Sequence, residues 1–347
     1  MRYSESRAGN ERETMDFPGY RVVEDGLFFP SGAISCHDVI YDAEYRLVPE
    51  SCVIRGKVNP ENVSRAPEYL PDAFRRKLER RRLSHQQKRM LFLGTFVGKH
   101  YGHLLTEGIA RYWYLIGRPD HGARIPAPYN PFGLRAHLED LLKPQQSHWK
   151  AFLPVFGIGS DQILVTREPV YASEIIVPNP SMQNRGQISP AHLAVTKRLA
   201  VHLIRSAEIA RDEAPVYLSR SKFRKRGKKQ YLGEVAIEDY CKGHGCRIVY
   251  PEQLSLKEQI ILFNTHDTFI GFSGSAFHSV MFRLVDRRAT NIYLLDSAEN
   301  SNFQLIDGLM KNSAHYIPCV EELAGERVWK VSYEKAAERL GALMRWV

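Results

Sequence analysis

The sequence lacks the features by which secreted and membrane-spanning proteins are usually recognised. Its five cysteines are odd in number and scattered over 347 residues, which argues against a disulfide framework and favours a reducing compartment. No apolar run reaches the roughly 18 to 20 residues of a membrane-spanning helix. The first residues also lack the apolar core of a signal peptide. We therefore expect a cytoplasmic protein.

Patterns typical of metal sites are also missing. Cys241 and Cys246 are spaced too loosely for half of a zinc site, and no matching pair of Cys or His residues follows them. No Asp-x-Asp pair of the metal-chelating kind stands at the end of an expected strand. The sequence therefore predicts no bound metal.

What the chain does have is the composition of a soluble globular protein. It is 44% hydrophobic and 25% charged, without a repeat or a low-complexity tract. Its length is sufficient for two domains with a sizeable core. The formal net charge of +9 favours anionic partners.

Residues 216–318 carry a regular alternation of strands and helices. The expected strands are 216–218, 247–250, 268–272, 291–295 and 316–317, and the expected helices between the first three are 234–241 and 255–263. Ser255 and Glu258 fit a capping box at the start of the second helix. This spacing predicts a parallel sheet with helices on both faces, and such sheets bind ligands beyond the carboxyl ends of their strands.

Two of these strand ends carry groups suited to a diphosphate. The loop after residue 218 holds Arg220 and Lys222 and continues into the basic run 224–229. The turn 273–276 (Ser-Gly-Ser-Ala) opens an expected helix, where backbone N–H groups and the helix dipole favour an anion. A diphosphate needs this combination of fixed positive charge and convergent N–H groups. A solvated basic loop and an ordinary helix start would contain the same residues, so both interpretations stay open.

In the first half of the chain, His103 is the candidate for acid–base chemistry. Apolar residues from Gly102 onward are spaced as in a helix, which puts His103 and Glu107 four apart on one face. A histidine titrates near neutral pH, and a carboxylate partner would fix its tautomer, so the pair suits a general base. A structural histidine in a helical turn is the alternative.

These motifs, taken together, resemble glycosyltransferase family 61. The resemblance is carried by residues 217–222 (Tyr-Leu-Ser-Arg-Ser-Lys), 248–255, 270–282, 98–105 and 111–113, in the same order and at similar spacing. Gln259 and Phe263 also fit. The chain departs from the family pattern at Gly233, where Asn is usual. It also departs at residues 271–274 and around Ser279. Bacterial members of this family, which is related to DUF563, act in capsular and exopolysaccharide synthesis.

The resemblance implies two Rossmann-like domains that face each other across a cleft, as in the GT-B type. We expect a flexible N-terminus at residues 1–16, an acceptor-side domain at 17–178 and a nucleotide-sugar domain at 179–318. The Pro- and Asn-containing segment 178–186 is the linker candidate. A C-terminal helix within 319–347 is expected to pack back on the first domain.

The implied activity is transfer of a sugar from a nucleotide-sugar donor to a glycan or lipid-linked saccharide, with inversion and without a metal or other cofactor. The enzyme would be a hexosyl- or pentosyltransferase of surface polysaccharide synthesis. His103 would be the base and Glu107 its partner, provided that the two domains face each other. The donor-binding candidates are Ser219, Arg220, Lys222, Glu252, Ser273, Gly274, Ser275, Ala276 and His278. Glu234 is a weaker candidate, for ribose hydroxyls or for orienting the basic loop.

Contact with a membrane surface is a further expectation. Residues 72–90 are predicted to form one helix rich in Arg and Lys. It is either a solvated surface helix or an electrostatic contact with anionic lipid at the inner membrane.

Two other functions fit parts of the sequence. A basic two-domain protein can bind nucleic acid, although the basic residues here are not interleaved with aromatics or set in a reading helix, so no nucleic acid is expected as a partner. A polysaccharide pyruvyltransferase would also use Arg, Lys and His for an anionic donor.

Overall fold

The computed structural model places the chain in two compact units, Met1–Arg198 (unit 1) and Leu199–Val347 (unit 2). The residues that it describes are 18–35, 37–53, 65–80, 86–94, 101–118, 123–128, 148–204, 209–223, 229–284, 290–296, 301–323 and 328–345. The expected flexible N-terminus, residues 1–16, lies outside these ranges, as does the segment 134–142, for which the sequence predicts a helix.

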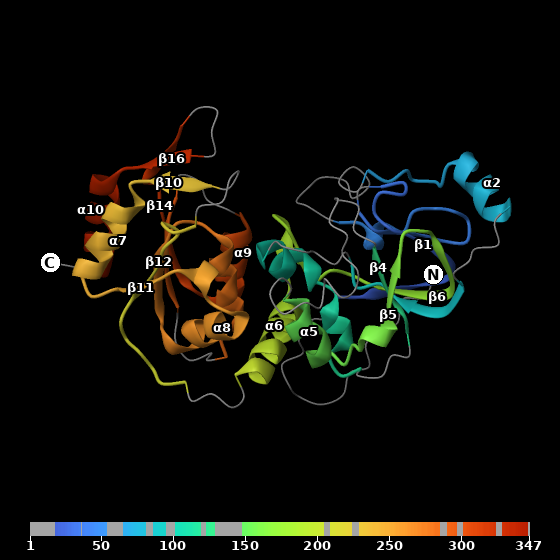
Figure 1. The fold of residues 1–347 in the computed structure, drawn as a ribbon, viewed down its shortest axis with the longest axis horizontal. Coiled ribbons are helices and arrows are strands. Elements are labelled where there is room, and N and C mark those ends of the chain that lie inside the picture. The colour runs from blue at the N-terminus through green and yellow to red at the C-terminus, as the bar shows by residue number, and fades with distance from the viewer. Residues whose placement is uncertain are drawn as a thin grey trace. The chain divides into compact units, whose positions relative to one another are not determined.

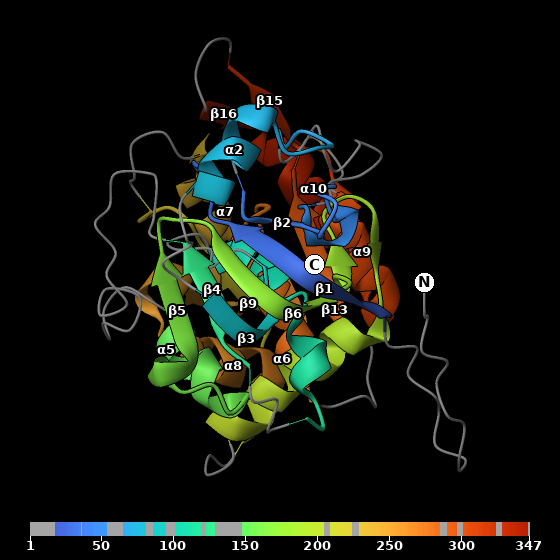
Figure 2. The ribbon, with the colours of Figure 1, turned by 90° about the vertical axis from the view of Figure 1, so that its right-hand side faces the viewer.

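Unit 1 is built on a four-stranded mixed sheet in the order β2-β1-β6-β3. The strands are β1 (Tyr20–Phe29), β2 (Val39–Tyr41), β3 (Gln86–Leu91) and β6 (Val170–Pro178). β1 runs antiparallel to β2 and β6, whereas β3 runs parallel to β6, and Figure 2 shows β1, β6 and β3 side by side. Because side chains alternate along a strand, Phe28 and Phe29 enter different hydrophobic clusters.

Short helices and two small sheets complete unit 1. The helical elements are η1 (Pro49–Ser51), α2 (Asp72–Arg80), α3 (Tyr101–His103), the π-helix η2 (Leu104–Gly108), η3 (Tyr112–Leu115), α5 (Trp149–Val155), η4 (Ser160–Gln162) and α6 (Pro190–Leu203), which continues into unit 2. β4 (Ile125–Pro128) pairs in parallel with β5 (Ile163–Thr166), and β7 (Met182–Gln183) pairs antiparallel with β8 (Gln187–Ile188).

The structure corrects the single helix expected at 72–90. The helix α2 ends at Arg80, and residues 86–91 form the strand β3 instead. Parallel pairing with β6 satisfies the backbone of this segment, and Met90 and Leu91 become fully buried. This tertiary pairing outweighs the helix preference of its Gln, Lys and Arg residues.

Unit 2 contains the parallel sheet that the sequence predicts. Its strands are β9 (Val216–Leu218), β11 (Arg247–Val249), β12 (Thr268–Gly271), β13 (Asn291–Leu295) and β14 (Ser313–Ile317). All pairings are parallel, in the order β11-β9-β12-β13-β14. The chain therefore moves outward from β9 to β11 and then crosses back to β12 on the other side of β9.

Helices cover both faces of this sheet. On one face lie α7 (Glu234–Gly243) and α10 (Tyr333–Met344), whose Ile237 and Leu340 share a core with Tyr217 and Ile270. On the other face lie α8 (Leu256–Thr265), which begins with the predicted capping box, and α9 (Ser301–Met310) (Figure 1). Two short helices, η5 (Pro251–Gln253) and η6 (Ser275–Phe282), follow β11 and β12.

A small sheet extends the α7 and α10 side of unit 2. Its strands are β10 (Gln230–Leu232), β15 (Val320–Glu322) and β16 (Val328–Val331), in the order β10-β16-β15. The helix α10, expected to return to the first domain, buries Ala336 and Leu340 in the core of unit 2.

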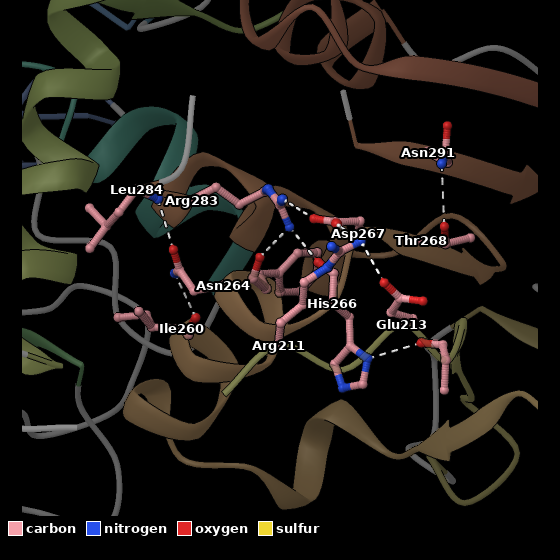
Figure 3. Close-up of polar contacts among 12 residues, drawn as sticks. Arg211, Glu213, Ile260, Asn264, His266, Asp267, Thr268, Arg283, Leu284 and Asn291 are labelled. Carbon is pink, nitrogen blue, oxygen red and sulfur yellow. Dashed lines mark hydrogen bonds and ion pairs between the residues drawn. The ribbon is translucent and has the colours of Figure 1, made fainter. Parts of the chain in front are cut away.

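At the amino ends of β9 and β12, a buried arginine and a histidine belong to one polar network (Figure 3). Arg283 is 2% exposed and donates to the carbonyl of Phe263 and to the carboxylate of Asp267, each at 2.6 Å. It also donates to the carbonyl of His266. The Nδ1 of His266 contacts the carbonyl of Ala214 at 2.9 Å, just before β9. This network fixes the edge of the sheet at which the two strands begin.

The structure thus has a mixed α/β fold with sheets of parallel strands. The two units differ, because two of the three pairings in the large sheet of unit 1 are antiparallel. The expected linker at 178–186 contains β7 and ends just before β8, and it lies within unit 1. Among the described residues, no helix combines the length and apolarity needed to traverse a bilayer.

Candidate functional site

The carboxyl ends of the unit 2 strands bring several predicted residues to one edge. β9 is followed by Ser219 and Arg220, and its neighbour β12 is followed, after Phe272, by Ser273 and Gly274. The chain leaves β9 and β12 toward opposite sides of the sheet, so this is the point at which strand order reverses. Open α/β sheets bind ligands in the crevice at such a point.

Arg220 is held at this point by neutral groups. Its guanidinium donates to the carbonyls of Ser273 and Lys229, each at 3.3 Å. Its Nε is buried and has no hydrogen-bond partner among the described residues. A Cβ at Gly274 would collide with its Nη1, so glycine leaves room for the guanidinium in this position. The positive charge of Arg220 is therefore fixed in place without a carboxylate beside the fork.

Glu234 fixes the backbone of the same loop. It begins α7, is 3% exposed, and accepts the backbone N–H of Arg220 at 2.7 Å. Burial raises the pKa of Glu234 to about 7, although the N–H and the charge of Arg220 act in the opposite direction. Glu234 thus orients the basic loop, one of the two roles expected for it.

A second carboxylate, Glu238, organises the other side of the loop. It accepts the hydroxyls of Ser219 at 2.6 Å, Ser221 at 2.9 Å and Tyr250 at 2.5 Å. Burial would raise its pKa, but these donors outweigh burial and lower it. Lys222 lies over the ring of Tyr250, 3.7 Å from the centroid, and therefore points to this aromatic ring.

On the opposite side of Arg220, Asp296 follows β13 and joins three partners. It accepts Lys229 Nζ at 2.9 and 3.2 Å, the hydroxyl of Ser273, and the hydroxyl of Tyr231 at 3.5 Å. Burial lowers the pKa of Lys229, but its interactions with Tyr231 and Asp296 outweigh burial and raise it. The Tyr231 ring also stacks on Phe272, with centroids 4.1 Å apart.

The remaining donor-binding candidates occupy different settings. Ser275 and Ala276 begin η6, whose first carbonyl partner is Gly274. His278 is buried and stacks on Phe303, with ring centroids 4.9 Å apart. Glu252 lies exposed in η5. The structure thus brings Ser219, Arg220, Ser273 and Gly274 together, whereas residues 224–228 of the basic run lie outside its described residues.

Sequence reasoning missed Glu238 and Asp296, which hold this edge together. Asp296 is the first residue after an expected strand, so the rule that selected Arg220 and Ser273 would also have found it. Glu238 lies one helical turn after Glu234, on the same face of α7. Both carboxylates could therefore have been identified from their positions relative to the expected strand and helix.

In unit 1, the structure confirms that His103 and Glu107 face each other. His103 Nδ1 lies 3.1 Å from a Glu107 oxygen, and Asn184 Nδ2 donates to the other carboxylate oxygen. Because an ionised carboxylate only accepts, this contact places the proton of a neutral His103 on Nδ1. The expected helix is interrupted here, since Glu107 lies in the π-helix η2 and the helical turn of α3 ends at His103.

A buried histidine holds the π-helix in place. His192 Nε2 contacts the carbonyl of Leu105 at 2.7 Å, and its Nδ1 contacts Ser181 Oγ at 2.9 Å. Burial lowers the pKa of His192 to about 4, although the contact with Leu105 raises it. Trp113 is buried and donates its Nε1–H to the carbonyl of Asn179 at 2.8 Å, whereas the Tyr101 ring lies beside His148.

Comparison with known proteins gives a family for this geometry. The family model described as Glycosyltransferase 61 matches residues 101–292, more than half of the 347 residues. The matched region contains His103, Arg220 and the turn at Gly274. No curated protein matches the chain. Since the family model covers most of the chain, this protein belongs to glycosyltransferase family 61 and is a glycosyltransferase.

Proposed function

We propose that this enzyme moves a sugar from a nucleotide-sugar to a glycan or lipid-linked saccharide, with the donor diphosphate at the carboxyl ends of β9 and β12. The observation that carries this proposal is Arg220, whose guanidinium is held by two neutral carbonyls at the reversal of strand order. A diphosphate would supply the anion that the guanidinium lacks among the described residues.

The proposed chemistry is direct displacement at the anomeric carbon. The acceptor oxygen forms the new glycosidic bond as the bond to the diphosphate breaks, and the configuration inverts. Arg220 stabilises the negative charge that develops on the leaving diphosphate, and backbone N–H groups at the start of η6 add to this. This electrostatic role would replace a metal ion, so we propose that turnover is metal-independent.

His103 is the proposed base for the acceptor hydroxyl. It takes the proton on Nε2 while Glu107 accepts from Nδ1 and stabilises the resulting imidazolium. The proposal requires a GT-B type arrangement, in which unit 1 presents His103 toward the donor bound by a Rossmann-like unit 2.

The proposed setting is surface polysaccharide synthesis on the cytoplasmic side of the membrane. Capsule and exopolysaccharide pathways use lipid-linked acceptors, and the formal net charge of +9 would favour peripheral contact with anionic lipid.

A thermal-shift panel of nucleoside diphosphates and their sugars tests the donor site. A ligand that binds the folded enzyme raises the melting temperature, and Arg220→Ala should abolish this shift for the nucleotide family that stabilises the wild type. No shift with any nucleotide, in a folded wild-type protein, would overturn the donor site. Loss of turnover in a chelator, restored by manganese or magnesium, would overturn metal independence alone.

A further inference from the structure

The position of the Arg220 guanidinium depends on two carbonyl groups far apart in the sequence. Its Nη1 donates to Ser273 O and its Nη2 to Lys229 O. The side chains of these same two residues converge on one carboxylate, that of Asp296. The two groups that hold the guanidinium are therefore themselves held by a third residue.

Asp296 is buried and accepts hydrogen bonds from three residues. Its side chain is 8% exposed and accepts Lys229 Nζ on both oxygens, together with the hydroxyls of Ser273 and Tyr231. Three of these contacts are to Oδ2 and one is to Oδ1, so protein groups donate to both oxygens of the carboxylate. Among these donors are the two residues whose carbonyls hold Arg220.

The arrangement also solves an electrostatic problem at an anion site. A carboxylate bonded directly to Arg220 would fix its orientation but would offset the charge that an anionic ligand needs. Here the carboxylate is paired with Lys229 instead, and among the described residues the guanidinium donates its hydrogen bonds to two carbonyls. Arg220 is oriented while its charge remains available.

We propose that Asp296 is a positioning residue for Arg220, which it sets in place for a nucleoside diphosphate by fixing the loops of Ser273 and Lys229. This inference rests on the proposed donor site. The alternative is that Asp296 only stabilises the end of β13.

Asp307 provides a matched control for that alternative. It is also in unit 2, is 7% exposed, and accepts Asn312 Nδ2 at 2.7 Å and Tyr316 OH at 2.6 Å. None of these groups contacts Arg220 in the described structure. Asp307→Asn therefore perturbs a buried carboxylate of the same unit without reaching the guanidinium.

Calorimetric titration with uridine diphosphate and guanosine diphosphate tests the inference on wild type, Asp296→Asn, Arg220→Ala and the double variant. For the nucleotide that the wild type binds, Asp296→Asn should weaken the affinity about tenfold. Added to Arg220→Ala, it should weaken the affinity no further, because it acts through that arginine. Asp296→Glu, which keeps the charge, should bind more tightly than Asp296→Asn, and Asp307→Asn should bind as the wild type does.

Each other outcome overturns a different statement. Wild-type affinity in Asp296→Asn, or further weakening by Asp296→Asn in the Arg220→Ala background, overturns the positioning role and leaves the donor site standing. No binding of either nucleotide to the folded wild type overturns the donor site and the inference with it. If Asp296→Asn does not fold, Ser273→Ala removes one link while keeping the carbonyl, and should weaken binding about threefold. Unchanged affinity in Ser273→Ala would then overturn the inference.

Discussion

An arginine lies at each of the two edges of the unit 2 sheet, and the two arginines differ in burial and in the charge of their partners. At the amino edge, Arg283 is 2% exposed and donates to two carbonyls and to the carboxylate of Asp267. At the carboxyl edge, Arg220 is half-buried and donates to two carbonyls, with no ion pair among the described residues. The charge of Arg283 is neutralised by Asp267 within the fold, whereas the charge of Arg220 is available to an anionic ligand.

Neutral partners alone do not mark a ligand site. Arg111 in unit 1 also donates to carbonyls, those of Pro178, Glu50 and Cys52, but it is buried. Burial lowers its pKa to about 10. Partial exposure at the reversal of strand order therefore distinguishes Arg220 from an arginine that only joins loops.

The largest expected effect is on stability, at the amino edge. Arg283→Met should lower the free energy of unfolding by about 3 to 5 kcal/mol, because it leaves buried carbonyls and one oxygen of Asp267 without their donor. Denaturant unfolding measures this loss. The affinity of the folded fraction for nucleoside diphosphates should not change. A loss below about 1 kcal/mol would contradict the structural role of Arg283.

Arg220→Ala should show the opposite balance. Turnover should fall by about 10² to 10³, since the charge developing on the leaving diphosphate loses its main stabilising group. The melting temperature without ligand should stay close to that of the wild type, because the two carbonyl contacts at 3.3 Å are long. Steady-state kinetics and thermal unfolding on one preparation check both statements. A large fall in melting temperature would show that Arg220, like Arg283, has a structural role.

At the carboxyl edge of the unit 2 sheet, the sequence predicted the functional residues that closely follow a strand. Arg220 and Gly274 were found because each comes two residues after the end of a short apolar run. The pairing of Lys229 with Asp296, 67 residues apart, could not be read in the same way, since it depends on how a loop folds over the sheet. The strand β3 was also missed, because Gln86 to Arg89 have helical preferences and only pairing with β6 makes them a strand.

The two edges also differ in the surroundings of their carboxylates, and this difference predicts a pH-dependent stability. Asp267 contacts Arg283 and also lies 3.5 Å from Arg211, whereas Glu234 is buried and accepts one backbone N–H. Burial raises the pKa of Glu234 from 4.5 to about 7, so the folded state holds its proton more tightly than the unfolded state. This stabilisation is complete below pH 4.5 and is lost as the pH rises through about 7.

Glu234→Gln isolates this contribution. Between pH 5 and pH 8, the wild type should lose roughly 2 to 3 kcal/mol of unfolding free energy relative to the variant. Denaturant unfolding at several pH values measures the difference. Glu258→Gln, at the exposed start of α8, serves as the control and should show no loss over the same range. A constant difference between wild type and Glu234→Gln would show that the carboxyl titrates alike in both states.

The smallest expected effect concerns Asn184, which acts on the proposed base His103 through Glu107. Asp296 acts on Arg220 in the same indirect way in unit 2. Asn184 donates to one Glu107 oxygen while His103 contacts the other, so it fixes the carboxylate that orients the proposed base. Asn184→Ala should lower kcat about tenfold and leave the KM for the donor unchanged. In a Glu107→Gln background the same substitution should cost nothing more, because the contact to be fixed is already altered. Gln183→Ala, on the same hairpin, controls for loosening of β7 and β8. If it lowers kcat as much as Asn184→Ala does, the hairpin and not the amide is what supports Glu107.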